Sequence, residues 1–205
     1  MNIRDQPEHR PFDVVVTCYK ECAEEIMLTL LKAKACGSRQ VYLLDDAGRD
    51  ELKSFCDAKG VTYERRIRSA AFETKARNLN SFLLKYNDEL ADRFILLDAD
   101  MVITDQACIG EMSNMLDLEP RLAFVQCPQR YYDLHESDPL CMSSMPFYDV
   151  HLKASSIMSS CPCVGTNVMF RKKAVWDVGL FPTESLTEDY NIAMRLHSNG
   201  WKSKY

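Results

Sequence analysis

Two pairs of aspartates follow apolar runs in this sequence. Asp98 and Asp100 come directly after residues 94–97, and Asp45 and Asp46 end a second such run. In extended backbone, residues i and i+2 point to the same side, so Asp98 and Asp100 can face one ligand. Carboxylates together with phosphate oxygens suit Mg²⁺ or Mn²⁺. A D-x-D spacing also fits a solvated turn, but its place at the end of an apolar strand favours a ligand site.

Charged residues also open two predicted helices. Lys75 and Arg77 begin one of them, and a helix N-terminus with a lysine attracts phosphate. Glu188 and Asp189 begin the other, where the helix dipole keeps Asp189 ionised, as a general base must be. The alternatives are a solvated basic helix face for the first pair and helix-start stabilisation for the second.

Strand and helix patterns alternate along the chain. We predict strands over residues 12–17, 41–44, 61–65, 93–97, 122–125 and 168–170, and helices over residues 22–34, 50–59, 75–86, 149–158 and 187–197. Gly60 should close its helix in the left-handed conformation. Ser185 and Glu188 have the spacing of a capping box. Continuously apolar strands are covered on both faces, so the pattern predicts an α/β fold with a parallel sheet.

Composition excludes several classes of protein. The chain has 205 residues, of which 46% are hydrophobic and 27% charged, as expected of one globular domain. Its net charge of −5 gives no bulk attraction to nucleic acid, so no nucleic-acid partner is expected. No apolar run exceeds four residues, whereas a membrane helix needs about 20. The first residues also lack the apolar stretch of a signal peptide.

The cysteines argue against a zinc site. There are nine, none in a C-x-x-C pair, and only four His could act as further ligands. The sequence therefore predicts small buried thiols in a reducing, cytoplasmic compartment.

Seven short blocks and a closing segment run in order through the chain. They are V-T-C-Y-K-E at 16–21, V-Y-L-L-D-D-A-G at 41–48, K-A-R-N-L-N at 75–80, L-D-A-D at 97–100, F-V-Q-C-P-Q at 124–129, V-G-T-N-V-M-F-R at 164–171, L-T-E-D at 186–189 and L-H-S-N-G-W-K at 196–202. This series resembles the family 2 glycosyltransferases, most closely the cellulose synthase-like branch. Arg77 and Thr17 stand where the family has Gly and Pro.

The resemblance implies a GT-A fold, with a central, mostly parallel sheet and helices on both faces. It also implies a UDP-sugar donor, a saccharide acceptor, Mn²⁺ or Mg²⁺, and transfer with inversion. The implied site residues are Cys18, Tyr19, Glu21, Asp45, Asp46, Lys75 and Asp98 for the nucleotide sugar, Asp98 and Asp100 for the metal, Gly165, Thr166 and Glu188 for the acceptor, and Asp189 as the base.

The predicted organisation is one domain over 1–205, with a tail at 1–11, a donor half at 12–100 and an acceptor half at 101–205. The family's Q-x-x-R-W motif and membrane helices are not in this sequence. We therefore expect a catalytic core that binds donor without making a long polymer, at the cytoplasmic face of a membrane if it belongs to a longer parent protein.

Two alternatives remain open. One is a non-catalytic nucleotide-sugar-binding module, or an inactive fragment of a membrane polysaccharide synthase. The other is a nucleotidyltransferase, which would need a Gly-rich phosphate loop near the N-terminus, whereas the first glycine is Gly37.

Overall fold

The structure is a computed structural model that describes residues 10–66, 74–132, 134–135, 137–139 and 141–205. Most of the predicted tail, 1–11, thus lies outside the described residues. The strands are β1 (Asp13–Cys18), β2 (Gln40–Asp45), β3 (Thr62–Glu64), β4 (Arg93–Asp98), β5 (Leu122–Gln126), β6 (Val168–Arg171) and β7 (Lys202–Lys204). The helices are α1 (Ala23–Ala35), α2 (Asp50–Lys59), α3 (Lys75–Lys85), α4 (Gln106–Leu118), η1 (Pro146–His151), α5 (Leu152–Ile157), α6 (Lys172–Asp177) and α7 (Glu188–Ser198).

All of these strands join one sheet, in the order β3-β2-β1-β4-β6-β5-β7. Neighbouring strands are parallel except at β6, which runs antiparallel to both β4 and β5. The prediction of a mostly parallel α/β sheet is therefore confirmed. Because β6 reverses direction, the loop that precedes it, not the end of the strand, reaches the edge of the sheet where the parallel strands finish.

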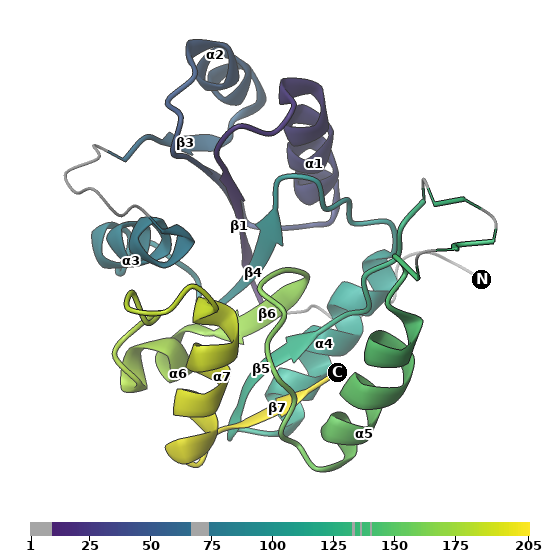
Figure 1. The fold of residues 1–205 in the computed structure, drawn as a ribbon. Coiled ribbons are helices and arrows are strands. Elements are labelled where there is room, and N and C mark those ends of the chain that lie inside the picture. Colours follow the sequence, from purple (N-terminus) through teal and green to yellow (C-terminus); the bar gives the residue numbers. More distant parts are fainter. Residues whose placement is uncertain (1–9, 67–73, 133, 136, 140) are drawn as a thin grey trace, which may run out of the picture.

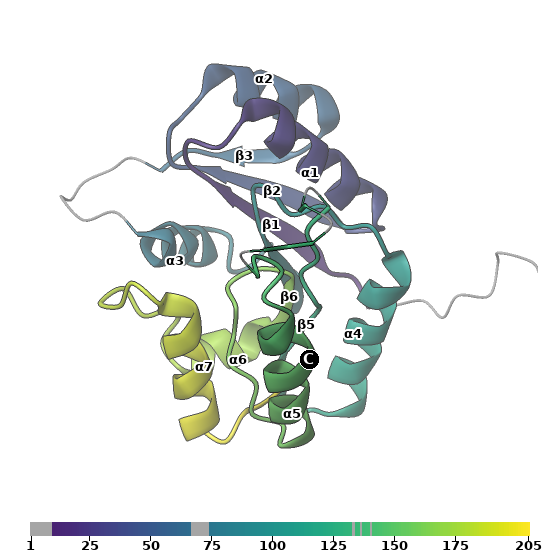
Figure 2. The same cartoon turned by 45° about the vertical axis from the view of Figure 1, so that its right-hand side comes forward.

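Helices cover both faces of this sheet (Figures 1 and 2). Helices α1, α2 and α4 pack on one face against side chains such as Val14 and Val16, whereas α3, α6 and α7 pack on the other against Val15. Successive residues of β1 thus point into two different cores, and all of them are buried. This double burial explains why the central strands are continuously apolar.

The ends of several helices follow the predictions from sequence. Gly60 ends α2 with φ of 62°, and its N–H donates to the Cys56 carbonyl, as predicted. The capping box at Ser185 is wrong. Helix α7 has Thr187 as its N-cap, so Glu188 is the first helical residue rather than the third, and the Ser185 hydroxyl accepts from the Thr187 N–H instead. The helix predicted over residues 149–158 is present as far as Ile157, but it begins earlier, as the π-helix η1.

The expectation that every cysteine is a buried free thiol is wrong. Cys108 of α4 and Cys127, just after β5, form a disulfide, because packing of α4 beside β5 brings residues 19 positions apart together. Cys22 and Cys141 are free but exposed. The cytoplasmic location stays a prediction.

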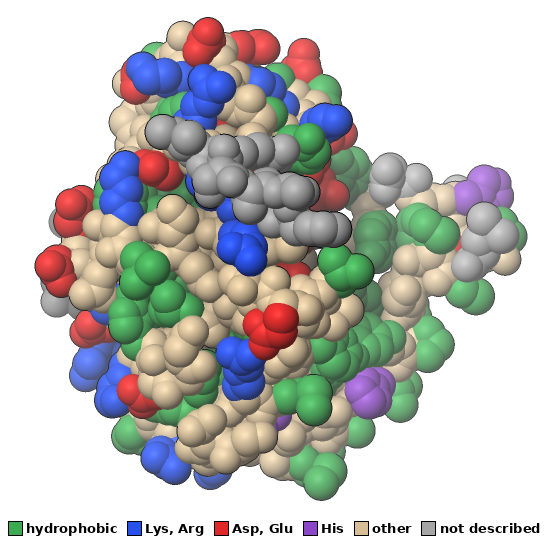
Figure 3. Space-filling model, turned by 60° about the vertical axis from the view of Figure 1, so that its left-hand side comes forward, with side chains coloured by type: hydrophobic (Ala, Val, Ile, Leu, Met, Phe, Trp, Pro, Cys, Tyr) green, Lys and Arg blue, Asp and Glu red, His purple; other side chains and the backbone are tan. Residues whose placement is uncertain are grey.

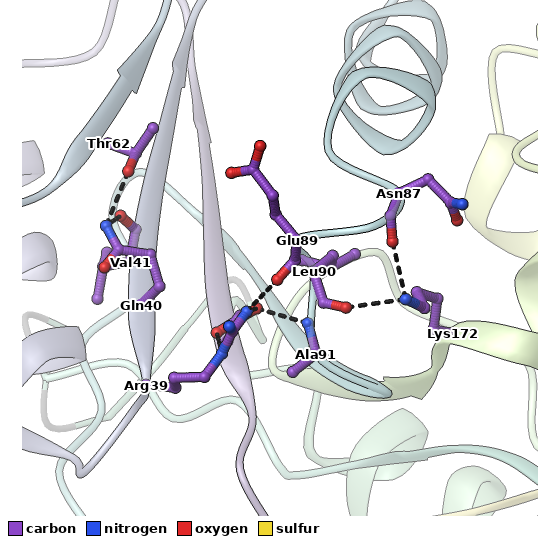
Figure 4. Close-up of polar contacts among 10 residues, drawn as sticks. Arg39, Gln40, Val41, Thr62, Asn87, Glu89, Leu90, Ala91 and Lys172 are labelled. Carbon is purple, nitrogen blue, oxygen red and sulfur yellow. Dashed lines mark hydrogen bonds and ion pairs between the residues drawn. The ribbon is translucent and has the colours of Figure 1, made fainter.

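The amino ends of the strands are tied together by a dense polar network (Figure 4). Asp13 is fully buried, and its carboxylate accepts from Arg39 Nε and Nη2 at 3.0 and 2.6 Å and from the Ala91 N–H at 2.8 Å. Lys172 Nζ donates to the carbonyls of Asn87 and Leu90 at 2.9 and 2.8 Å. This edge of the sheet is closed by hydrogen bonds and leaves the opposite edge for a ligand.

The outer surface mixes charges of both signs. Acidic and basic side chains lie interspersed on the face that Figure 3 shows, as the 25 basic and 30 acidic residues would suggest. No helix among the described residues has the length and apolar character needed to cross a bilayer.

Candidate active site

The carboxyl ends of three parallel strands meet at one level of the sheet. In the strand register, Thr17 of β1 lies beside Asp98 of β4, and Cys18 lies beside Asp45 of β2. The sequence predicted that its acidic clusters would gather at this edge, where open α/β sheets bind ligands. The strand register confirms this for Asp45 and Asp98, because both lie beside the last residues of β1.

Lys75 and Asp98 form the centre of the site. The Lys75 ammonium pairs with Asp98 Oδ1 and also donates to the Gly165 carbonyl at 2.8 Å. The Asp98 N–H donates to Thr166 Oγ1 at 2.9 Å, which ties the end of β4 to the loop before β6. Both side chains of the ion pair remain partly exposed, 24% for Lys75 and 39% for Asp98. The pair is thus held in place and still open to a ligand.

Asp189 approaches this centre from the first turn of α7. Gly165 has φ of 77°, and a Cβ placed on it would lie 3.0 Å from Asp189 Oδ2. The positive φ favours glycine at this position, and any larger residue would also press against the Asp189 carboxylate. The antiparallel β6, through its preceding loop, brings together Lys75, Gly165 and Asp189 from distant parts of the sequence.

Glu188 is half-buried beside these groups. Burial raises the pKa of its carboxyl group, the nearby Lys75 lowers it, and the carboxylates of Asp189 and Asp98 raise it further. The structure therefore brings six of the predicted site residues together, which are Lys75, Asp98, Gly165, Thr166, Glu188 and Asp189.

Asp45 and Asp46 differ sharply in their surroundings. Asp45 is fully buried and accepts from the N–H groups of Ala47 and Arg49 at 3.0 and 2.7 Å and from the Tyr63 hydroxyl at 3.0 Å. Burial alone would raise the pKa of Asp45, but these hydrogen bonds hold it below its usual value. The Asp45 carboxylate therefore shapes the loop between β2 and α2.

Asp46, the next residue, pairs with Arg66, and Oδ2 lies 3.1 Å from Nη2. Both side chains are about nine-tenths buried, 11% exposed for Asp46 and 10% for Arg66. The sequence analysis did not identify Arg66, and its position after β3 carries no motif that would have revealed it.

Arg49 joins the loops after β1 and β2. It donates to the Glu21 carbonyl at 2.7 Å and reaches Cys18 Sγ and Asp45 Oδ1 at 3.4 Å each. Tyr19 is 39% exposed, and its N–H donates to Glu21 Oε2 at 2.6 Å. The predicted nucleotide residues of the first loop thus lie beside the second loop, and Arg49 is a connecting residue that sequence reasoning missed.

Asp100 and Arg77 lie at the margins of this site. Asp100 is exposed and lines a separate cavity against α1. Among the described residues, no group of three or more His, Cys, Asp or Glu is arranged to hold a metal ion. Arg77 is exposed in the first turn of α3, and its N–H donates to the capping hydroxyl of Thr74 at 3.3 Å.

Comparison with solved structures identifies the fold. The mannosyltransferase PcManGT from Pyrobaculum calidifontis, solved with GDP-Man and Mn²⁺, superposes with a TM-score of 0.71 at 20% identity, covering 96% of this chain and 55% of that one. Glucosyl-3-phosphoglycerate synthase from Mycobacterium tuberculosis, solved with Mn²⁺, UDP and glucosyl-3-phosphoglycerate, gives 0.60 at 12% identity, covering 95% and 69%. The sheet and these matches define a GT-A fold, as the sequence predicted.

The chain belongs to glycosyl transferase family group 2, whose sequence model matches residues 94–205. It is 28% identical over 215 residues to the UDP-forming cellulose synthase catalytic subunit of Pseudomonas fluorescens (strain SBW25), covering 99% of this chain and 28% of that protein. It is 34% identical over 147 residues to a UDP-forming cellulose synthase catalytic subunit of Dictyostelium discoideum, covering 70% and 14%. The resemblance to the cellulose synthase-like branch is confirmed, and the chain spans about a quarter or less of the length of these relatives.

Proposed function

We propose that this domain transfers a sugar from a UDP-sugar donor to a saccharide acceptor with inversion at the anomeric carbon. The observation that carries the proposal is the convergence of Lys75, Asp98 and Asp189 around Gly165. An inverting displacement needs a cation at the leaving diphosphate and a base at the attacking hydroxyl. The similarity to UDP-forming cellulose synthase subunits supports a uridine donor.

Each residue has a role in this proposal. Asp189 accepts the proton of the acceptor hydroxyl as its oxygen bonds to the anomeric carbon and the bond from that carbon to the diphosphate breaks. Lys75, held by Asp98 and the Gly165 carbonyl, binds the negative charge that appears on the diphosphate. Gly165, Thr166 and Glu188 border the acceptor. Cys18, Tyr19, Glu21, Asp45 and Asp46 shape the nucleotide side, with Asp45 acting through the loop that it holds.

The carboxylates of Asp98 and Asp100 fit a divalent ion. Both are at least partly exposed, and both offer the oxygen ligands that Mg²⁺ and Mn²⁺ prefer. Two carboxylates suffice because such an ion completes its shell with water and substrate phosphate oxygens. When bound, the ion would supply positive charge at the diphosphate. We also propose that residues 12–100 form the donor half and 101–205 the acceptor half of one domain.

The test measures donor binding and transfer separately. The purified chain should bind UDP-glucose in Mn²⁺ more tightly than in chelator, and should release UDP when a cello-oligosaccharide is present. Asp189→Asn should lower turnover by about 10²–10⁴-fold with donor affinity nearly unchanged, because only the proton acceptor is lost. Asp177→Asn, which changes an aspartate of α6 that pairs with Lys173 on the surface, is the matched control and should retain turnover.

Two results would contradict the proposal. Loss of donor affinity in Asp189→Asn would mean that Asp189 merely stabilises the start of α7. Donor binding without either transfer or hydrolysis would indicate the non-catalytic module.

A further inference from the structure

A second cavity lies beside the site, on the α1 side of β4. Its volume is about 200 Å³, and it is lined by residues of three segments that are distant in sequence. Glu25 comes from α1, Asp100 follows β4, and Gln129 to Tyr132 follow β5. Pockets for drug-sized ligands occupy roughly 300–1,000 Å³, so this cavity admits one small unit.

Gln129 is the feature that points to a ligand. The residue is only 7% exposed, lines the cavity, and its side-chain amide makes no hydrogen bond to any described residue, whereas its backbone carbonyl accepts from Arg130. The atoms of this amide are not sealed inside the protein. Both its donors and its acceptor are therefore available to a molecule in the cavity.

The other lining groups define the chemistry of that molecule. The Glu25 and Asp100 carboxylates accept hydrogen bonds and disfavour an anion such as phosphate. The Arg130 guanidinium disfavours a metal ion, although it is also paired with Asp149 at 2.8 Å. Tyr131 and Tyr132, 43% and 85% exposed, offer aromatic surface at the mouth. A neutral molecule with many hydroxyls and an apolar C–H face satisfies all of these groups.

We propose that this cavity binds one sugar unit of a saccharide, separately from the donor and acceptor positions described above. The Gln129 amide and the Glu25 carboxylate bond its hydroxyls, and Tyr131 packs against its ring. A saccharide bound there would lie next to Asp100 and so beside the proposed metal-binding edge. The inference goes beyond the proposed function, because it requires neither donor nor transfer.

The test is a titration of the ¹⁵N-labelled chain with cellotetraose, without donor or metal, followed by NMR. The side-chain amide signals of Gln129, identified by their loss in Gln129→Leu, should shift together with backbone signals at the start of α1. Gln129→Leu and Glu25→Gln should each weaken binding at least tenfold. Glu24→Gln removes the same charge from the same helix turn but does not line the cavity, so it should stay within about twofold of the unmodified chain.

Three outcomes would overturn the inference. In one, shifts are confined to Gly165, Asp189 and their neighbours. In another, Gln129→Leu keeps a native spectrum and unchanged affinity. In the third, cellotetraose moves neither the Gln129 signals nor those at the start of α1. A chain that failed to bind UDP-sugar but gave the expected shifts would lose the proposed function and keep this one.

Discussion

Two aspartates at opposite ends of neighbouring strands each pair with a cation, and the two pairs differ in how far they are enclosed. Asp13, at the start of β1, has a fully buried side chain whose oxygens accept from Arg39 and from a backbone N–H. Asp98, at the end of β4, is 39% exposed, with Lys75 as its cation. A carboxylate whose bonds are all made inside the protein stabilises the fold, whereas one left partly open can bind a ligand.

Asp45 shows that position alone does not decide which kind of carboxylate results. It lies at the same edge as Asp98, yet it is fully buried and bonded by the β2–α2 loop and Tyr63. Burial of the side chain, rather than the end of the sheet at which it lies, therefore separates carboxylates that stabilise the fold from carboxylates that can bind a ligand. The adjacent Asp46, paired with Arg66, lies between these extremes.

Among substitutions that test this comparison, we expect the largest effect on turnover at Asp98. Asp98→Asn keeps the shape of the side chain but removes the charge that positions Lys75, so turnover should fall by about 10²–10³-fold. Because the pair is partly exposed, the free energy of unfolding should change by less than about 1 kcal/mol. Steady-state kinetics and urea unfolding of one preparation measure both quantities. A variant that unfolds much more easily, with turnover unchanged, would place Asp98 in the stabilising class.

Asp13→Asn should give the opposite result. The amide oxygen can replace Oδ2, which accepts from Arg39 Nη2 and from the Ala91 N–H, but the amide NH₂ in place of Oδ1 cannot accept from Arg39 Nε. One hydrogen bond and the negative charge opposite Arg39 are lost, so unfolding should become easier by about 2 kcal/mol. Arg39 is 45% exposed and can be hydrated, which keeps the loss below that of a fully buried pair. Asp88→Asn, an exposed change in the turn after α3, is the control. Donor binding should be unaffected in both, and a loss of binding in Asp13→Asn alone would contradict the comparison.

The sequence predicted the central strands well because their signal is local. The runs in β1, β2 and β4 are apolar at every central position, and the structure buries them on both faces. Helix α4 was not predicted, although Ile109, Met112 and Leu116 repeat at helical spacing and all three are buried. That signal was present and was missed.

Other features depend on partners that the sequence does not connect. Nothing local sets the direction of β6, a strand of four residues, yet its reversal places Gly165 against Asp189. The partner of Asp13 lies 26 residues away, and that of Cys108 lies 19 away. Residue type and spacing already indicated the paired aspartates, Lys75 and Asp189, and the resemblance to a family added the other candidate residues. The structure showed which of them are enclosed.

The smallest expected effect is on how the free energy of unfolding depends on pH, compared between a carboxyl group at the carboxyl ends of the strands and one at their amino ends. At the carboxyl edge, burial raises the pKa of Glu188. At the amino edge, the hydrogen bond from the buried Arg93 holds the pKa of Asp117 below its usual value. A carboxyl group whose pKa is raised by folding contributes its full stabilisation below its pKa in the unfolded chain, about 4.3. That stabilisation is lost as the pH rises through its pKa in the folded chain. A lowered pKa gives stability that is complete above about 3.9 and lost as pH falls through the folded value.

Glu188→Gln should therefore unfold less easily than the unmodified chain at pH 7, and this advantage should vanish towards about pH 4. Asp117→Asn should unfold more easily at neutral pH, and its deficit should shrink as the medium becomes more acidic. Urea unfolding at several pH values between about 3 and 7 measures both trends. If the two variants changed in the same direction with pH, burial of Glu188 and the hydrogen bond from Arg93 to Asp117 would not set the pKa values of these two carboxyl groups.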